Sequence, residues 1–342
     1  MPLKVSDIGE IGLIKRILKK TTTNKFNPSF FDDLSIKSLS DDAALINFGD
    51  RYLVATSDIL FKSTHFPDEM TPEQMGKKVV TVNISDLAAM GAKPLGIIVS
   101  MGLPKNMLLH DFDRLIDGII DGCLIYGMML IGGDTNESNE LTICGTCLGV
   151  VSRDNVLMKS GARAGDVVAV TGPLGLAAAG FEVLFNNLEI DPNSKEILLN
   201  HALNPEARSK EGILIAEKGY ATSATDITDG LAKEIGELID ANSGAIGITI
   251  YENLLPVPDE LLEVAYNIDK NPLDWILHYG EDFELLLTID KDSFNKIKDL
   301  IPLYEIGNVT SSGKMIIVSK DGVERILEPR GYEHLSPTKN LD

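Results

Sequence analysis

Apolar residues recur at helical spacing in three stretches of the first 150 residues. Ile8, Ile11 and Ile14 lie on one face of a predicted helix over 6–20, which Ser6 is placed to cap. Thr71 and Gln74 match a capping box with proline between them, so a second helix is predicted over 72–90. A third is predicted over 108–126. The intervening patterns predict strands over 43–47, 52–57, 95–102, 128–132 and 141–151.

A similar alternation returns after a polar connection at residues 152–165. The predicted helices cover 176–187, 194–201, 206–218 and 230–241, and the predicted strands cover 166–170, 245–250, 284–289, 303–309 and 314–318. Residues 21–40 are rich in Thr, Asn, Ser and Pro and are expected to be irregular. Because domains hold roughly 100–200 residues, this chain of 342 residues is expected to form two mixed α/β (α+β) domains, 1–152 and 153–342.

The charge balance narrows the class of partner. The chain has 51 acidic and 31 basic residues and a formal net charge of −20. Nucleic-acid binding needs clustered lysine and arginine, so it is not expected, and binding to anionic membranes is disfavoured. If so acidic a chain handles phosphates, cations must lie between protein and substrate. The composition therefore favours phosphate binding through bound metal ions rather than through clustered arginine side chains.

Cysteines and hydropathy give no sign of a secreted or membrane protein. The three cysteines are too few for a disulfide framework, and Cys144 and Cys147 fall on opposite faces of the predicted strand 141–151. They are expected to be small core residues rather than zinc or redox ligands. Residues 1–20 do not resemble a signal peptide, and the longest apolar runs are shorter than the roughly 20 residues that span a bilayer. A cytoplasmic location is expected.

Acidic residues cluster at the ends of predicted strands and at the starts of helices, usually beside Gly, Ser or Thr. They are Asp41, Asp42, Asp58, Asp86, Asp134, Asp226, Asp229, Glu281 and Asp282. Each alone is explained by a turn or a helix cap. Together they are typical of magnesium sites, because Mg²⁺ uses a few carboxylates plus substrate phosphates. The pattern therefore predicts a metal-dependent phosphate site.

Familiar phosphate-binding motifs are absent from the sequence. The chain has no GxxxxGK[ST] loop and no protein-kinase glycine loop. The glycines of 172–175 fit an ordinary turn as well as a phosphate loop. Metals held by carboxylates would then supply the charge stabilisation, which is sufficient because phosphoryl transfer depends mainly on positioning and electrostatics.

The motifs, taken in order, resemble one enzyme family over nearly the whole chain. They are Ser40-Asp-Asp-Ala-Ala, Thr56-Ser-Asp, His65, Asn83-Ile-Ser-Asp-Leu-Ala-Ala-Met-Gly-Ala, Gly132-Gly-Asp, Thr171-Gly, Asp226-Ile-Thr-Asp-Gly-Leu, Gly280-Glu-Asp and Gly331-Tyr. This order resembles the thiamine-monophosphate kinases, within the superfamily of ATP-binding aminoimidazole ribonucleotide synthetases. The stretch from Asn83 to Ala92 is specific for the superfamily, and Thr56-Ser-Asp with His65 narrows it to the thiamine enzymes.

The resemblance implies a two-domain aminoimidazole ribonucleotide synthetase-like fold. The N-terminal sheet would form the interface of a homodimer, and the C-terminal domain would be an α/β sandwich. ATP and thiamine monophosphate would bind between the domains with several Mg²⁺ ions. The γ-phosphate would pass directly to the acceptor phosphate, giving thiamine diphosphate without a covalent phosphoenzyme.

The resemblance also implies roles for individual residues. The metal ligands would be Asp42, Thr56, Ser57, Asp58, Asp86, Asp134, Asp226 and Asp229. Asp86 would bridge metals, and Asp86, Asp134 and Asp229 would be the catalytic carboxylates. ATP would contact Asp42, Gly133, Asp134, Lys159 and Thr228. The thiamine part would face His65, Glu281 and Tyr332.

Four positions depart from the family pattern. Ser40 and Tyr279 each stand where the family has glycine, and Thr228 stands where it has serine. Lys159 replaces an arginine and offers a point charge rather than a bidentate fork. Tyr279 bears on the shape of the substrate pocket more than on the metals.

Two alternative functions remain open from sequence. One is another synthetase or maturation enzyme of the superfamily. A selenide enzyme should carry a reactive cysteine near the N-terminus and a hydrogenase-maturation enzyme should end in cysteine, but residues 1–40 have none and the chain ends in Asp342. The purine-ring enzyme remains open. The other alternative is a non-catalytic nucleotide-binding protein, against which the complete acidic set argues.

Overall fold

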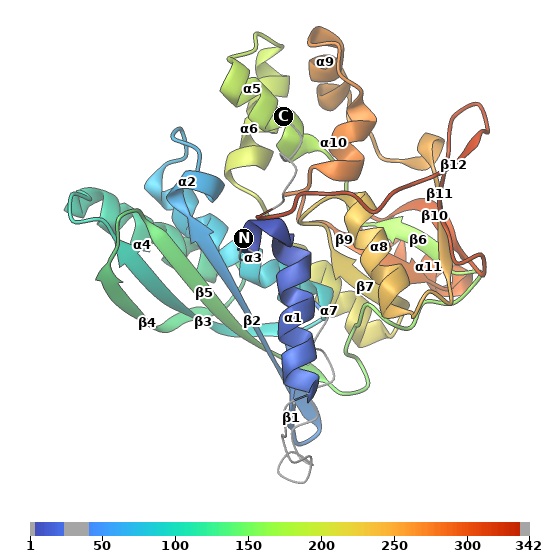
Figure 1. Ribbon diagram of the computed structural model, residues 1–342, viewed down its shortest axis with the longest axis horizontal. Helices are drawn as coiled ribbons and strands as arrows, with labels where there is room; N and C mark the ends of the chain where they lie inside the picture. Colours follow the sequence, from blue (N-terminus) through green and yellow to red (C-terminus); the bar gives the residue numbers. More distant parts are fainter. Residues whose placement is uncertain (1–3, 24–40, 336–342) are drawn as a thin grey trace.

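The computed structural model describes residues 4–23 and 41–335, which build two mixed sheets (Figure 1). The first sheet has the strand order β1-β2-β5-β3-β4, in which only β3 and β4 pair in parallel. Its strands are β1 (Ala44–Phe48), β2 (Arg51–Phe61), β3 (Lys93–Leu103), β4 (Met129–Glu137) and β5 (Thr142–Ser152). A short helix, α2 (Lys62–His65), follows β2.

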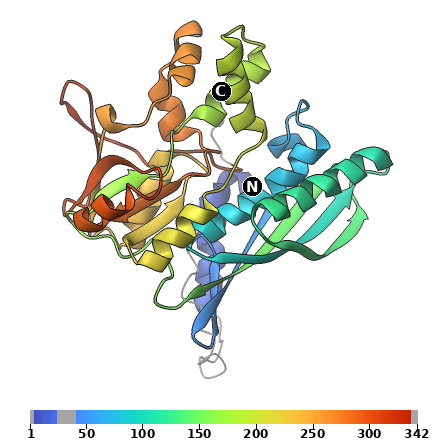
Figure 2. The same cartoon turned by 180° about the vertical axis from the view of Figure 1, so that it is seen from behind.

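Two long helices, α3 (Pro72–Ala89) and α4 (Leu109–Ile125), pack together on one face of this sheet (Figure 2). The predicted capping box starts α3: Gln74 N–H donates to the Thr71 hydroxyl at 3.3 Å, and Thr71 N–H donates to the Gln74 side chain at 2.8 Å. A Cβ on Gly118 would lie 2.1 Å from the Glu73 carbonyl oxygen, so only glycine allows α4 this close to α3.

The second sheet has the strand order β12-β11-β8-β10-β6-β9-β7. Its strands are β6 (Val167–Val170), β7 (Ala221–Asp226), β8 (Gly247–Tyr251), β9 (Leu285–Ile289), β10 (Tyr304–Thr310), β11 (Met315–Val318) and β12 (Glu324–Ile326). Its helices are α5 (Leu176–Asn186), α6 (Pro192–Leu203), α7 (Ser209–Lys218), α8 (Leu231–Ala241), α9 (Asp259–Asn267), α10 (Pro272–His278) and α11 (Lys291–Ile297).

Apolar side chains cover both faces of the second sheet. One core cluster combines strand residues such as Ile248 and Leu286 with residues of α5, α8, α9 and α10. The other combines Leu285 and Leu287 with α7 and α11. The expected α/β sandwich is therefore confirmed.

Helix α3 belongs to the cores of both sheets. Val79, Ile84 and Leu87 are buried against the first sheet. Ala88 and Ala89, near its C-terminal end, lie in the cluster that contains Ile215 of α7 and strand residues of the second sheet. Asp86, near the C-terminal end of α3, is thereby placed between the two sheets.

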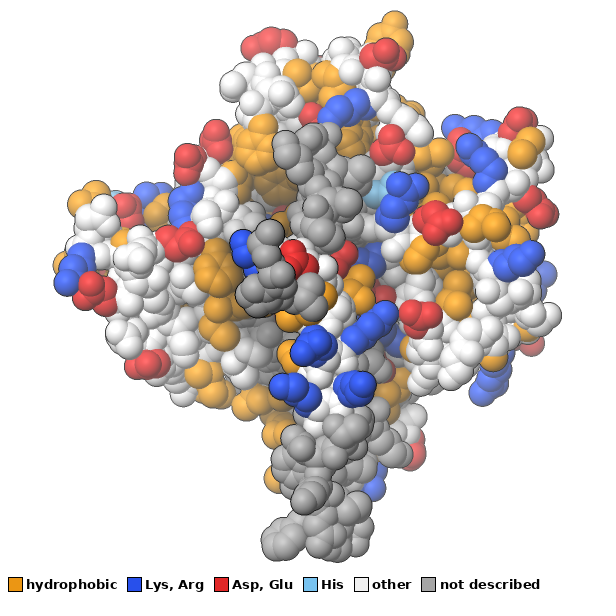
Figure 3. All heavy atoms as spheres, viewed as in Figure 1, with side chains coloured by type: hydrophobic (Ala, Val, Ile, Leu, Met, Phe, Trp, Pro, Cys, Tyr) orange, Lys and Arg blue, Asp and Glu red, His pale blue; other side chains and the backbone are white. Residues whose placement is uncertain are grey.

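The N-terminal helix α1 (Gly9–Thr23) runs along the outside and is joined to the C-terminal segment. His334 N–H donates to the Glu10 carboxylate at 3.1 Å, and Ile11 N–H donates to the Glu333 carboxylate at 3.3 Å. Figure 3 shows basic side chains gathered over α1. Ser6 does not cap this helix, because it lies in a preceding 3₁₀ turn, Val5–Asp7.

Most predicted elements are present within a few residues of their predicted ends. The strand predicted at 128–132 was too short, because β4 runs on to Glu137 and includes Asp134. Strands β7 and β12 and helices α2 and α9 to α11 were not predicted. Of the segment expected to be irregular, residues 21–23 end α1 and residues 24–40 lie outside the described part. No helix in the described ranges is long and apolar enough to cross a membrane.

Candidate active site

A cavity of about 830 Å³ lies where the first sheet and α3 meet the loops of the second sheet. That volume is in the range of small-molecule sites. Several predicted site residues from distant parts of the chain line it. They are Ser57, Asp58, His65, Asp86, Thr228, Asp229, Glu281 and Tyr332.

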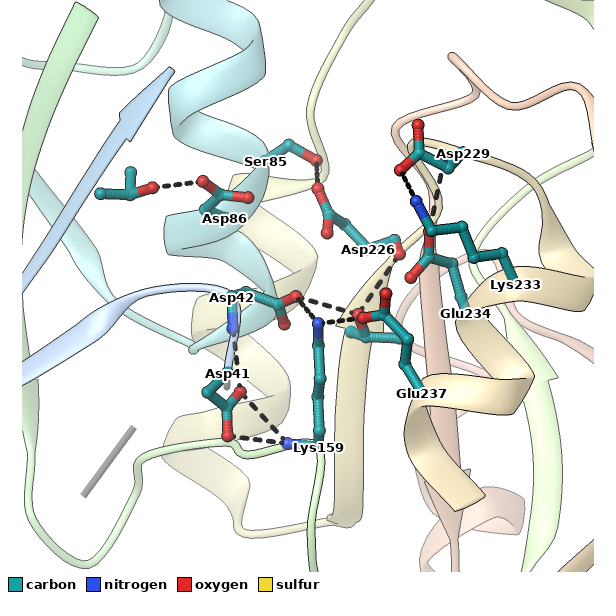
Figure 4. Close-up of polar contacts among 12 residues, drawn as sticks. Asp41, Asp42, Ser85, Asp86, Lys159, Asp226, Asp229, Lys233, Glu234 and Glu237 are labelled. Carbon is teal, nitrogen blue, oxygen red and sulfur yellow. Dashed lines mark hydrogen bonds and ion pairs between the residues drawn. The ribbon is translucent and has the colours of Figure 1, made fainter. Parts of the chain in front are cut away.

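Five aspartates lie close together here, and we call them the carboxylate cluster: Asp42, Asp58, Asp86, Asp226 and Asp229. Asp58, Asp86 and Asp229 line the cavity, whereas Asp42 and Asp226 are buried behind them. Figure 4 shows four of them converging from different elements. Asp58 comes from β2 and Asp86 from α3, whereas Asp226 ends β7 and Asp229 precedes α8. Asp42 lies just before β1. Both halves of the chain therefore contribute to one acidic centre.

Asp86 is the central member of the cluster. The Thr56 hydroxyl of β2 donates a hydrogen bond to its carboxylate. Burial, followed by the charges of Asp58, Asp226 and Asp42, raises the pKa of Asp86 well above its usual value. Burial and the charges of Asp226 and Asp229 likewise raise the pKa of Asp58 to about 6. Without a cation these carboxylates repel one another.

Asp42 and Asp226 are held by fixed partners. The Lys159 ammonium lies 2.8 Å from Asp42 and 2.6 Å from Glu237, and the Thr225 hydroxyl donates to Asp42 at 3.0 Å (Figure 4). The Ser85 hydroxyl donates to Asp226. Burial raises the pKa of Asp42 to about 8 despite the opposing charge of Lys159. Its second carboxylate oxygen, Oδ2, is buried without a hydrogen-bond partner.

Asp229 connects the cluster to the expected substrate residues. Its carboxylate lies 2.5 Å from the Lys233 ammonium, one turn along α8. Its carbonyl accepts a hydrogen bond from Tyr332 N–H at 3.0 Å, and Lys233 also donates to the Tyr332 carbonyl at 3.2 Å. Tyr332 is therefore fixed beside the acidic centre by its backbone, which leaves the ring free to face the cavity.

Glu281 is held by strained backbone and by a buried lysine. Its φ is 58° and follows Gly280 at 93°, where a Cβ would lie 2.2 Å from the Thr228 carbonyl oxygen. Glu281 N–H donates to that carbonyl at 2.8 Å. The Lys78 ammonium of α3 contacts both Glu281 oxygens, at 2.8 and 2.7 Å, and the His65 carbonyl at 3.1 Å.

Three rings that line the cavity, those of His65, His334 and Tyr332, lie against one another. His65 and His334 have ring centroids 5.3 Å apart, and Tyr332 meets His334 edge-on at 4.8 Å. Burial, with the charges of Lys78 and His334, lowers the pKa of His65, so the ring is neutral near pH 7. Phe61 N–H donates to His65 Nδ1 at 3.1 Å, which leaves the proton on Nε2 as a donor.

Other predicted residues do not line the cavity or do not face the cluster. Gly133 and Asp134 lie on the exposed edge strand β4. Lys159 is occupied by Asp42 and Glu237. The Ser57 hydroxyl contacts the Gly145 carbonyl and the Thr146 hydroxyl, because neighbours in a strand face opposite sides. Their roles stay predictions.

Sequence reasoning missed three residues of the site: Lys78, Glu234 and His334. Glu234 is 3% exposed beside Asp229, and burial and neighbouring acids raise its pKa well above the usual value. Lys78 had a detectable signal, because Lys78, Val82 and Asp86 recur every four residues of one helix and all three line the cavity. His334 had no ligand spacing that would have identified it.

The residues fit divalent cations by donor type and charge. The cluster offers hard carboxylate oxygens, which Mg²⁺ prefers. The unpartnered Oδ2 of Asp42 and the mutual repulsion of the carboxylates are both relieved by a cation. Within residues 4–23 and 41–335, no three such side chains already converge in ligating geometry, so binding would draw them closer.

Magnesium is expected to stabilise the protein more at pH 8 than at pH 5.5. Because the pKa values of Asp42 and Asp58 are raised, to about 8 and about 6, the folded chain binds protons more tightly than the unfolded chain. Ionising the buried carboxylates therefore lowers the free energy of unfolding. This destabilisation is absent below about pH 4 and grows as pH rises through these pKa values. Thermal melts with EDTA or Mg²⁺ at both pH values test this, and equal Mg²⁺ shifts would contradict it.

Comparison with known proteins agrees with this geometry. Residues 40–151 match the AIR synthase related protein N-terminal domain, and residues 163–328 match the corresponding C-terminal domain. The thiamine-monophosphate kinase of Pyrococcus horikoshii is 40% identical over 306 residues, which are 90% of this chain and 94% of the relative. That of Aquifex aeolicus is 31% identical over 97% of this chain and all of the relative.

Solved structures give the same assignment. A structure described as AaThiL complexed with AMPPCP and TMP superposes with a TM-score of 0.84 at 30% identity, covering 98% of this chain and 99% of that one. Thiamine monophosphate kinase from Aquifex aeolicus gives a TM-score of 0.79 at 29% identity, covering 96% and 100%. The chain belongs to the AIR synthase related family and, within it, to the thiamine-monophosphate kinases.

Proposed function

We propose that this chain transfers the γ-phosphate of ATP to thiamine monophosphate, giving ADP and thiamine diphosphate. The observation that carries the proposal is that the carboxylate cluster and the expected substrate residues His65, Glu281 and Tyr332 border one cavity. Family membership and the relative solved with AMPPCP and TMP support the same reaction. ATP is the co-substrate.

In this proposal Asp42, Asp58, Asp86, Asp226 and Asp229 hold several Mg²⁺ ions. Bound magnesium would supply charge stabilisation for the phosphate oxygens during transfer. The protein holds three of these carboxylates through neighbouring side chains: Thr56 on Asp86, Ser85 on Asp226 and Lys159 on Asp42. These partners orient each carboxylate toward a shared centre.

The chain's remaining groups bind and orient the acceptor. An acceptor phosphate is already an anionic nucleophile, so the site requires no general base, and we propose direct transfer without a covalent phosphoenzyme. Lys78 holds the Glu281 carboxylate in place, while neutral His65 offers its Nε2 proton as a hydrogen-bond donor. Tyr332, fixed through Asp229, closes the same end of the cavity.

A coupled assay tests the proposal. Thiamine monophosphate, ATP and Mg²⁺ are incubated with the protein, and thiamine diphosphate and ADP are measured together. Equal amounts that disappear with EDTA are expected. ADP without thiamine diphosphate would show that the acceptor is different and would favour another synthetase of the superfamily.

Replacing Tyr332 by alanine is expected to raise the KM for thiamine monophosphate about tenfold while changing kcat little, since the ring contributes uniform binding at the cavity wall. The matched control is Tyr266→Ala, because Tyr266 is 87% exposed on α9 and does not line the cavity. Steady-state kinetics with thiamine monophosphate varied at saturating ATP measure both. An unchanged KM in Tyr332→Ala would show that thiamine monophosphate does not bind against this ring.

We also propose a homodimer that joins the first sheets along β4. This edge strand is exposed along its length and begins with Met129, Leu130 and Ile131. Exposed apolar edge strands readily pair with another chain. Replacing Ile131 by glutamate is expected to give a monomer by light scattering. A dimer of unchanged stability in that variant would contradict this interface.

The proposed location is the cytoplasm. All three cysteines are free thiols, as in proteins of reducing compartments, and the reaction consumes ATP.

A further inference from the structure

The outer part of the cavity has an aromatic wall that the phosphate chemistry leaves unused. We define the aromatic wall as Phe181 and Phe185 of α5 and Tyr279, which follows α10. The rings of Phe181 and Phe185 stack with centroids 5.6 Å apart and planes 17° apart. The rings of Phe181 and Tyr279 are 6.2 Å apart. All three residues line the cavity.

The wall exposes ring surface on a buried support. Phe181 is only 6% exposed, whereas Phe185 is 59% and Tyr279 is 37% exposed. Figures 1 and 2 both show α5 between α2 and α10, which places the wall near the segment that carries His65. Two aromatic faces are thus open to a ligand while their neighbour holds them in position.

The charged groups around the aromatic wall favour stacking of a positively charged ring over a neutral one. Among the residues that the structure describes, six carboxylates and two ammonium groups, those of Lys62 and Lys78, line the cavity. Burial, then the charges of Glu281 and Glu182, raises the pKa of Tyr279, so its ring stays neutral. Electron-rich ring faces in a negative cavity attract cations, and a flat cation gains stacking as well.

We propose that the aromatic wall binds the positively charged aromatic ring of the acceptor and that Phe185 and Tyr279 determine specificity for it. This inference rests on the proposed function, since the acceptor's phosphate would point toward Asp58, Asp86 and Asp229 at the other end.

Kinetics of Phe185 variants test the inference. Phe185→Leu is expected to raise the KM for thiamine monophosphate about tenfold, the size of a partly desolvated cation–π contact. Phe185→Trp should not raise it, because tryptophan offers a stronger π face. The KM for ATP and kcat should stay within about twofold. Tyr266→Leu removes a ring that is even more exposed and lies away from the cavity, so it should change nothing.

Calorimetry with thiamine alone separates this inference from the proposed function. Phe185→Leu is expected to weaken thiamine binding about tenfold, the same cation–π contact, without ATP or metal present. If the wild type makes thiamine diphosphate but Phe185→Leu binds and reacts like the wild type, the wall is overturned alone. If the wild type makes none but binds thiamine in a Phe185-dependent way, the proposed function fails and the wall stands. If the wild type makes thiamine diphosphate but does not bind thiamine, the wall is overturned and the proposed function stands. If it neither makes thiamine diphosphate nor binds thiamine, both are overturned.

Discussion

Replacing Asp86 by asparagine is expected to lower kcat roughly 10³-fold, the cost of removing a principal charge-stabilising group from an active site. Asp86 interacts electrostatically with three other aspartates of the carboxylate cluster, and its carboxylate accepts a hydrogen bond from the Thr56 hydroxyl. Asparagine keeps the shape and loses the charge. Steady-state kinetics at saturating Mg²⁺ measure the effect, and near-wild-type turnover would contradict the metal assignment.

The same substitution is expected to raise the melting temperature of the cation-free protein at pH 8. The raised pKa of Asp86 means that its ionised form is disfavoured in the folded chain, so removing the charge is stabilising where the group would ionise. Near pH 4 the two proteins should melt alike. Asp117→Asn is the control, because Asp117 is exposed on α4 and should behave alike at both pH values. A lower melting temperature for Asp86→Asn than for the wild type at pH 8 would show that repulsion between the clustered carboxylates does not destabilise the folded chain.

Replacing Lys78 by methionine is expected to destabilise the protein by about 2 kcal/mol, less than the roughly 3–5 kcal/mol of a fully buried ion pair, because the Glu281 side chain is 28% exposed. Lys78 is 1% exposed and joins α3 to the Glu281 loop and to the His65 carbonyl. The KM for thiamine monophosphate should rise as well, since Glu281 loses its fixed position. Thermal melts and acceptor kinetics measure both effects.

A double-mutant cycle makes this prediction specific. Glu281→Gln alone leaves a buried ammonium with a weaker partner, so Lys78→Met with Glu281→Gln should cost less than the sum of the single changes. Lys105→Met removes an exposed pair with Glu137 and should shift the melting temperature by no more than about a degree. Additive effects of Lys78→Met and Glu281→Gln would show that the two residues act independently.

Local signals in the sequence identified most elements and part of the site. The capping box at Thr71 predicted the start of α3, and its spacing placed Asp86 on a buried helix. The strand predicted at 128–132 ended too early because Gly132 and Gly133 resemble a turn, whereas parallel pairing with β3 carries β4 on to Glu137. Strand pairing is a tertiary effect that overrides the local turn preference of glycine.

The site's internal supports could not be predicted from local pattern. Lys78 meets Glu281 across 203 positions in sequence, and Tyr332 is fixed by the backbone of Asp229. His334 lines the cavity because the C-terminal segment joins α1 there. The positive φ of Glu281 and Phe283 likewise arises where that loop pairs with residues 227–228. Such contacts depend on the assembled fold rather than on spacing.

Tracing labelled phosphate tests direct phosphoryl transfer between ATP and thiamine monophosphate. The protein is mixed with Mg²⁺, thiamine monophosphate and ATP labelled at the γ-phosphate, then quenched in acid during the first turnovers. With direct transfer, label is expected to appear in thiamine diphosphate as fast as it leaves ATP, with none attached to the protein. Label on the protein, or released as inorganic phosphate without thiamine diphosphate, would contradict it.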